Sequence, residues 1–229
     1  MPRGAFVLLA LLSIAPARAQ VSGSATLMSD YRFRGISLSD NRPALQLAVA
    51  YDRANGLYAG AMASSARPDA DSGSDVQLLP YLGFARRLDS GLGWDVGIAY
   101  AAFVEASGYD YPEVHVGVNT DHLGVRLSFA HRYFGDDSDA LYLELNGNRP
   151  VSDRVRLLAH VGWLHHDTTE ESFPGLQRQH LDLRVGVGID VAGCDLQLAW
   201  VWSDGEQARY PSSPQVDHSA LIASLSRAW

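Results

Sequence analysis

The residues best placed to do chemistry are charged side chains that recur at every second position inside otherwise apolar segments. The main candidates are Arg32, Arg34, Asp95, Glu113, Arg126, Arg132, Glu144, Arg156, Asp182 and Arg184. The same pattern includes Asp30, His115, His160, Asp190 and Asp195. Because side chains two positions apart share one face of a β-strand, these groups would gather on one face of a sheet. If the sheet closes into a barrel with its apolar face outside, they line the lumen.

The charge on this face is nearly balanced, with six arginines against seven acids. Opposite charges on neighbouring strands, about 5 Å apart, would pair and bridge the bore. Segregated arginines would instead form a track for anionic solutes, as basic rings do in anion-selective pores. We expect pairing to dominate, also for Arg32 and Arg34, which would bind Asp30 and acids on adjacent strands.

Residue types typical of catalytic and metal sites are present but poorly spaced. Ser128 and His131 would share a strand but face opposite sides, so they cannot form the Ser–His pair of an outer-membrane lipid hydrolase. His165 and His166 are adjacent and also face opposite ways, and no second group near Asp167 completes four ligands. We therefore expect no enzymatic activity, no metal and no cofactor.

Short alternating segments separated by turn signals predict twelve β-strands. They span residues 22–34, 44–52, 56–65, 75–86, 92–104, 112–120, 122–133, 139–148, 154–165, 179–190, 194–202 and 217–229. Most are close in length to the roughly 9–11 residues that cross a bilayer at a tilt. The expected fold is an all-β, antiparallel up-and-down transmembrane β-barrel.

The connections between these segments alternate between short and long, as the periplasmic turns and extracellular loops of such barrels do. The six longer connections carry essentially all of the net negative charge. Solvated loops attract charge in any fold, and this is the simpler explanation. The alternative is an acidic outer face that holds divalent cations beside lipopolysaccharide.

An acidic chain without basic clusters also argues against a nucleic-acid partner.

The N-terminal residues read as a secretory signal. Residues 1–19 combine Arg3, an apolar run and a small-residue cleavage site, so the barrel domain is expected to span residues 20–229 and to begin at Gln20. The apolar run is shorter than the roughly 20 residues of a membrane helix.

Cys194 is the single cysteine, which excludes an internal disulfide.

The last segment alternates and ends on an aromatic residue. Leu221, Ala223, Leu225 and Trp229 share one face of the strand expected at 217–229. A terminal strand ending in an aromatic residue resembles the signal by which outer-membrane barrels are recognised by the insertion machinery. The same strand would close the barrel against the first.

Alternation alone does not distinguish a membrane barrel from a soluble one, whose apolar face points inward. Two further features favour the membrane. The polar face mixes charges with small residues such as Gly97, Ala99 and Gly186, and aromatic residues such as Tyr51 and Trp94 gather near strand ends, where an interfacial girdle lies.

The segment Ser29–Ser37, with Pro43–Gln46 after it, resembles the hallmark of the TorF-type porin family of bacterial outer-membrane proteins. The similarity continues in Gly56–Gly60 and Tyr109–Pro112. Met62 stands where the family usually has Trp, and Ser65 replaces an Asn. The resemblance implies an outer-membrane barrel and a transport role.

Together these patterns predict a monomeric outer-membrane barrel that contacts lipid and lipopolysaccharide and passes small hydrophilic solutes or ions. A closed structural or adhesin-like barrel is the main alternative. A lipid hydrolase is the minor one.

Overall fold

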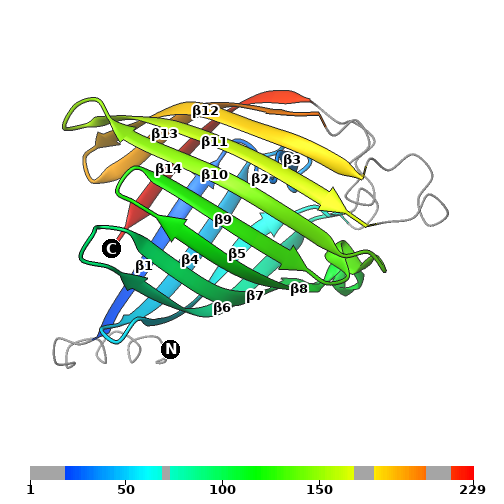
Figure 1. Cartoon of the computed structure of the whole chain (residues 1–229). Helices are drawn as coiled ribbons and strands as arrows, with labels where there is room; N and C mark the ends of the chain where they lie inside the picture. Colours follow the sequence, from blue (N-terminus) through cyan, green and yellow to red (C-terminus); the bar gives the residue numbers. More distant parts are fainter. Residues whose placement is uncertain (1–18, 69–72, 168–177, 205–217) are drawn as a thin grey trace, which may run out of the picture.

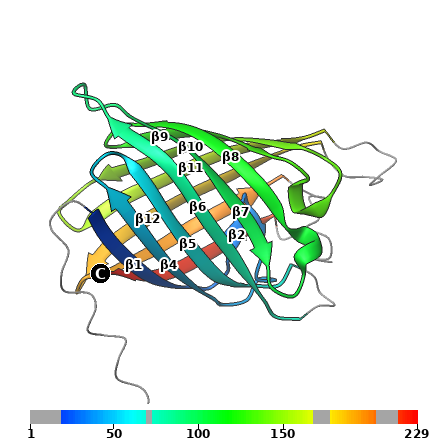
Figure 2. The ribbon, with the colours of Figure 1, turned by 90° about the horizontal axis from the view of Figure 1, so that it is seen from below.

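The computed structural model describes residues 19–68, 73–167, 178–204 and 218–229. Twelve long strands in these ranges form one closed antiparallel barrel, in which each strand is tilted against the barrel axis (Figures 1 and 2). The elements are β1 (Ala19–Met28), β2 (Arg32–Phe33), β3 (Ile36–Ser37), β4 (Ala44–Arg53), β5 (Leu57–Ala66), β6 (Asp75–Arg87), β7 (Gly93–Phe103), η1 (Ser107–Tyr109), β8 (Tyr111–Asn119), β9 (Leu123–Ala130), η2 (Tyr133–Gly135), β10 (Ala140–Pro150), β11 (Val155–His166), β12 (Gln179–Val191), β13 (Cys194–Ser203) and β14 (Ser219–Ala228). The prediction of a twelve-stranded up-and-down barrel is confirmed.

The barrel closes where β1 meets both β4 and β14. Met28 pairs with Ala44 on one side and with Ser224 on the other. Beyond the end of β14, the backbone of Trp229 exchanges two hydrogen bonds with Gly23, of 3.0 and 3.1 Å. The Trp229 ring covers Gly23, where a Cβ atom would come within 2.8 Å of the indole. The terminal aromatic residue thus seals the seam between the first and last strands.

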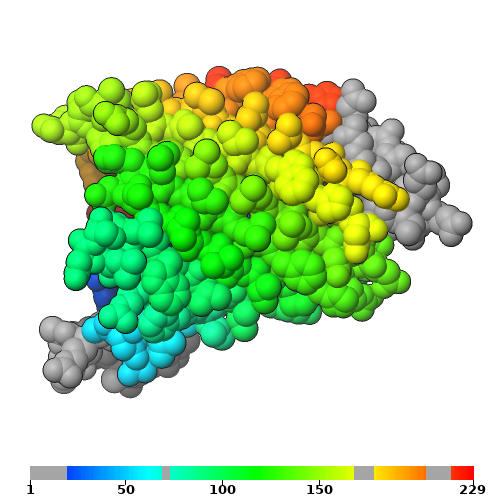
Figure 3. Space-filling view, viewed as in Figure 1, coloured from blue at the N-terminus to red at the C-terminus, as the bar shows by residue number. Residues whose placement is uncertain are grey.

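The outer surface of the barrel is apolar. Along most of the long strands, every second side chain points away from the barrel and is apolar, as Val185 (59% exposed) and Leu198 (51% exposed) are. Figure 3 shows one face of this exterior, over β8 to β12, as a closely packed surface. A soluble protein does not expose such a continuous apolar surface, whereas a bilayer core requires one. The orientation of the alternation therefore identifies an outer-membrane barrel.

Two predicted strands end earlier than expected. The first was expected over 22–34 but β1 ends at Met28, because the chain turns into the barrel at Ser29. The strand expected over 122–133 ends at Ala130, because Arg132 adopts a left-handed conformation (φ 53°) and η2 follows. The other predicted strands agree with the structure to within a few residues.

Short turns join the strands at the end where β1 begins and β14 finishes, and longer connections join them at the other end (Figure 1). The predicted signal peptide, residues 1–19, lies almost entirely outside the described residues and stays a prediction. Among the described residues, no helix is long and apolar enough to cross a membrane.

An arginine in the middle of the lipid-facing surface tests the position of the bilayer. We expect Val185→Arg, at the centre of β12, to lower the free energy of unfolding by about 2–4 kcal/mol, and Val191→Arg, at the end of the same strand, by about 0–1 kcal/mol. Urea unfolding in lipid vesicles measures both variants. Equal losses would show that depth in a membrane does not govern this surface.

Candidate functional site

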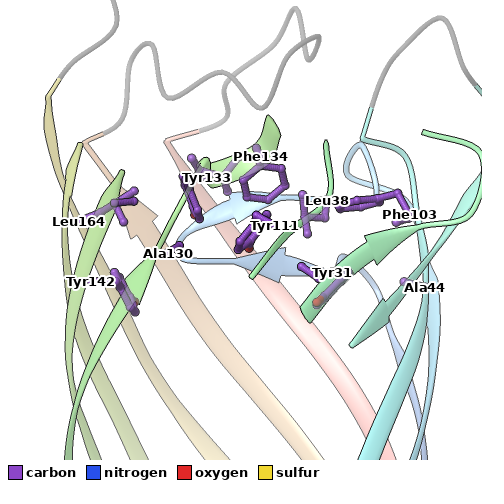
Figure 4. Close-up of a cluster of buried hydrophobic side chains, with 14 residues drawn as sticks. Tyr31, Leu38, Ala44, Phe103, Tyr111, Ala130, Tyr133, Phe134, Tyr142 and Leu164 are labelled. Carbon is purple, nitrogen blue, oxygen red and sulfur yellow. The ribbon is translucent and has the colours of Figure 1, made fainter. Parts of the chain in front are cut away.

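The connection between β1 and β4, residues 29–43, folds into the barrel mouth. Its two short strands, β2 and β3, form a hairpin that crosses the interior between the walls (Figure 4). The turn is made by Arg34 (φ 51°) and Gly35 (φ 81°). Gly35 is required on two counts, because its backbone is left-handed and because a Cβ atom there would lie 2.5 Å from the Cβ of Asp182 on β12. We call residues 29–43 the inward segment.

A hydrogen-bond network around the Asp30 carboxylate fixes the shape of the inward segment. Asp30 accepts hydrogen bonds from Arg32 Nε (2.6 Å), Ser37 Oγ (2.5 Å) and Ser39 Oγ (3.0 Å). Arg32 also donates to the carbonyl oxygen of Gly35 (3.2 Å) and to Asn41 Oδ1 (3.0 Å). A buried carboxylate with several donors is well compensated for the loss of water, so this network makes the segment a defined structure.

Arg34 attaches the tip of the hairpin to the wall. Its guanidinium forms a buried salt bridge with Glu113 on β8 and lies over the rings of Phe33, Tyr133 and Tyr142, with the shortest of these distances 4.3 Å to the Tyr142 centroid. His180 on β12 contacts the Arg34 carbonyl oxygen at 3.2 Å. The tip therefore spans the mouth from β8 to β12.

An aromatic cluster packs around the inward segment at the end of the barrel that carries the long connections (Figure 4). The rings of Tyr111, Tyr133 and Phe134 pack edge-to-face or tilted against one another, with centroids 4.8–5.0 Å apart. Tyr31 donates a hydrogen bond to Gln77 Oε1 on β6 (2.7 Å), and burial raises the pKa of Tyr31 well above its usual range, so the phenol stays protonated. The cluster narrows this end of the lumen.

Below the inward segment lies a cavity of about 1270 Å³ that extends to the short turn at residues 119–124. Of the ten main candidates from the sequence, eight line it: Arg32, Arg34, Asp95, Glu113, Arg126, Glu144, Asp182 and Arg184. Asp30, His115 and His160 line it as well. Arg32 and Arg34 reach it from the inward segment, however, and not from the barrel wall where they were expected.

Two similar clusters of Tyr, His and Asp side chains occupy the cavity wall. In the first, His115 Nε2 lies 2.9 Å from Asp95 and 3.1 Å from the Tyr58 hydroxyl. In the second, His160 Nε2 lies 2.9 Å from Asp182 and 3.0 Å from the hydroxyl of Tyr142, which also donates to Asp182 at 3.0 Å. These contacts keep the two buried carboxylates hydrogen-bonded within the wall.

Each cluster depends on a glycine on the neighbouring strand. Asp95 is paired across the sheet with Gly117, and Asp182 with Gly162. A Cβ atom at either glycine would come within 2.5 Å of the carboxylate that lies over it. The small residues on the polar face thus make room for side chains that lie flat against the wall.

The remaining two candidates lie outside the cavity lining. Arg132 was expected on the strand, but it sits beyond the end of β9, exposed, with Asp137 at 3.5 Å. Arg156 lies over Gly188 and binds Asp195 at 2.5 Å, and Gln197 joins Asp195 to Arg184 through hydrogen bonds of 2.6 and 2.9 Å. Arg156 and its neighbours thus form a third charged network.

Ser128 and His131 do not form a hydrogen-bonded pair within the described part of the chain. His131 lies beyond β9 and binds Asp139 at 2.7 Å, while Ser128 lies within β9 and lines the cavity.

His165 stacks on Trp163, and His166 packs against Tyr133 on the other side of the strand. In the ranges that the structure describes, no group of three or more His, Cys, Asp or Glu side chains could hold a metal ion.

Sequence analysis missed the tyrosines of the lumen. Tyr58, Tyr81 and Tyr142 all line the cavity, and the first two pack together with centroids 6.1 Å apart. The signal that could have revealed them is their parity, because Tyr58 alternates with the outward Leu57 and Tyr142 with the outward Leu143.

Residues 14–228 match the model of a family described as "Bacterial protein of unknown function (Gcw_chp)". The chain belongs to the Gcw_chp family. No curated protein matches the chain significantly in sequence.

Solved structures of outer-membrane proteins share the fold of this Gcw_chp member. The KdgM porin, solved in complex with disordered oligogalacturonate, is 9% identical with a TM-score of 0.53, over 92% of this chain and 99% of KdgM. The NanC porin is 9% identical with a TM-score of 0.56, over 91% and 98%. An outer membrane channel from Pseudomonas putida F1 is 11% identical with a TM-score of 0.54, over 94% and 97%. At such identities the similarity concerns the fold alone.

The steric fit of the hairpin tip can be tested at Gly35. We expect Gly35→Ala to displace the inward segment for two reasons. The new Cβ atom would clash with Asp182, and alanine is strained at the positive φ of this position. Trypsin should then cleave the refolded barrel after Arg32 or Arg34 at least about tenfold faster, since cleavage follows the population of the opened segment.

Gly73→Ala is the matched control, because Gly73 has a similar φ (74°) but nothing lies within 4 Å of its missing Cβ. Cleavage within the inward segment should be unchanged in this variant. Resistance of Gly35→Ala to trypsin would contradict the close fit against Asp182.

Proposed function

We propose that this protein is an outer-membrane channel for small hydrophilic solutes, with the inward segment as a constriction in its mouth. The observation that carries the proposal is the cavity of about 1270 Å³, lined with polar and charged side chains, that runs from the inward segment to the short-turn end. A barrel built only as a scaffold has no need of so large a polar interior, since small barrels fill theirs with packed side chains.

The structures that share this fold support the proposal, because KdgM and NanC are described as porins and a third as a channel. The hallmark at Ser29–Ser37 adds a finer assignment, to the TorF-type porins. The hallmark segment Ser29–Ser37 lies within the inward segment, which constricts the mouth and would therefore shape the conduction path. Contacts with lipopolysaccharide and insertion machinery, and a monomeric state, remain predictions.

The same inward segment also favours the second candidate function, a closed structural barrel. Arg34 joins the hairpin to β8 by a buried salt bridge, and aromatic residues pack around it. If this packing is permanent, solutes do not pass. The two candidates differ in whether the refolded protein conducts current.

Planar-bilayer recording of the refolded chain from Gln20 to Trp229 distinguishes them. A channel gives discrete current steps in symmetric salt, and its conductance is expected to be well below that of a 16-stranded porin because the bore is narrower. Silence from protein shown to be folded by heat-modifiable electrophoretic mobility would refute the channel and favour the closed barrel.

If the channel conducts, the Arg34–Glu113 salt bridge should control its opening. We expect Glu113→Gln to increase the open probability or the unitary conductance, because the salt bridge that joins the hairpin tip to β8 is lost. The matched control is Asp40→Asn, which breaks an exposed ion pair with Arg42 (3.4 Å) in the same segment and should leave the current unchanged. Identical currents from Glu113→Gln and wild type would exclude a gating role for the hairpin.

A further inference from the structure

Two charged side chains stand apart from the others in the cavity. The remaining Asp, Glu and Arg side chains of the lining, namely Asp30, Arg32, Arg34, Asp95, Glu113, Asp121, Asp182 and Arg184, each form a hydrogen bond of 2.9 Å or shorter. Arg126 reaches Asp95 only at 3.4 Å, and its side chain is 45% exposed. Glu144 forms no hydrogen bond or ion pair within the described part of the chain. These two groups are the ones available to a solute.

Arg126 and Glu144 lie side by side. They are directly opposite each other in the pairing of β9 with β10, and both line the cavity. Cross-strand neighbours on one face have Cβ atoms about 5 Å apart, so the two side chains could easily pair. They do not, and the cavity therefore contains a guanidinium and a carboxylate next to each other, each with free hydrogen-bonding capacity.

The neighbouring strands explain why the pair stays apart. On its other side Arg126 faces Gly117, the glycine covered by the Asp95 carboxylate, and this charge draws the guanidinium away from Glu144. Glu144 faces Gly162 on β11, over which the hydroxyl of Tyr142 lies. The two available charges therefore lie next to each other on the cavity wall without forming an ion pair.

We propose that Arg126 and Glu144 form a binding site for small zwitterionic solutes of the α-amino-acid class. The solute carboxylate binds the Arg126 guanidinium, and the solute ammonium binds the Glu144 carboxylate. A purely anionic solute would be repelled by Glu144 and a purely cationic one by Arg126, whereas a zwitterion satisfies both groups. Asn146, the next lumenal residue on β10 and exposed, supplies a further polar contact.

The inference rests on the proposed channel, because it names a class of solute that the lumen would pass. The site itself can nevertheless be measured without current. Saturation-transfer-difference NMR of the refolded chain in detergent micelles reports binding of three matched probes: L-alanine, which carries both charges, L-lactate, which lacks the ammonium, and L-alaninamide, which lacks the carboxylate. We expect saturable binding of L-alanine, with the other two weaker by about tenfold or more, as for the loss of one charge-assisted hydrogen bond.

Two variants that each remove one charge should change the preference in opposite directions. Arg126→Gln removes the carboxylate-binding half and should shift the preference to L-alaninamide, whereas Glu144→Gln should shift it to L-lactate. The control Arg149→Gln, at an exposed position on β10 outside the cavity lining, should bind like wild type. Equal binding of the three probes by wild type, or an unchanged preference in both variants, would overturn the site.

The NMR and bilayer results are independent. A chain that binds L-alanine without conducting refutes the channel and keeps the site. A chain that conducts but does not discriminate among the probes refutes the site alone.

Discussion

The structure depends on closure of one ring of backbone hydrogen bonds. Lipid offers no partner for an unpaired N–H or C=O group, so a sheet can span a bilayer only if it has no edge. Ser24 on β1 shows how this is met, because it pairs with Ala48 of β4 and with Ala228 of β14. Once the ring is closed, period-two alternation sends every second side chain to the lipid and the others to the lumen, and the polar interior follows as a consequence.

A twelve-stranded ring leaves more room than wall side chains alone fill, and the protein partly fills it in two ways. At one end the inward segment and its aromatic neighbours occupy the mouth. Along the wall, charged and tyrosine side chains lie flat over glycines such as Gly117 and Gly162, which keeps the space between opposite walls free. Bulky residues of the inward segment and its aromatic neighbours therefore form the constriction, and glycines along the wall keep the cavity open.

Much of this fold was predictable because strands carry a local signal. Val114, Val116 and Val118 alternate without interruption, and β8 lies where they predicted it. The path of Asp30–Arg34 was not predictable, since these residues continue the alternation of β1 and yet leave the wall. The contacts that decide their position join residues far apart in sequence, with Arg34 bound to Glu113, 79 positions away, and to His180, 146 positions away. Pairing of the lumenal charges could be expected from their balance, and the contact of Arg32 with Asp30 from their closeness in sequence, but the long-range partners could not.

The charge balance also bears on how such a lumen could select solutes. Closely paired charges such as Arg34 with Glu113 offset each other, so at a distance they add little to the potential that a diffusing ion meets. Net charge is then a weak filter, and discrimination must arise from shape at the constriction or from groups left free at short range. Arg126 and Glu144 are such groups, and their opposite signs cancel for a distant ion but not for a solute that contacts both. A lumen whose charges are mostly paired can therefore still distinguish a zwitterion from an ion.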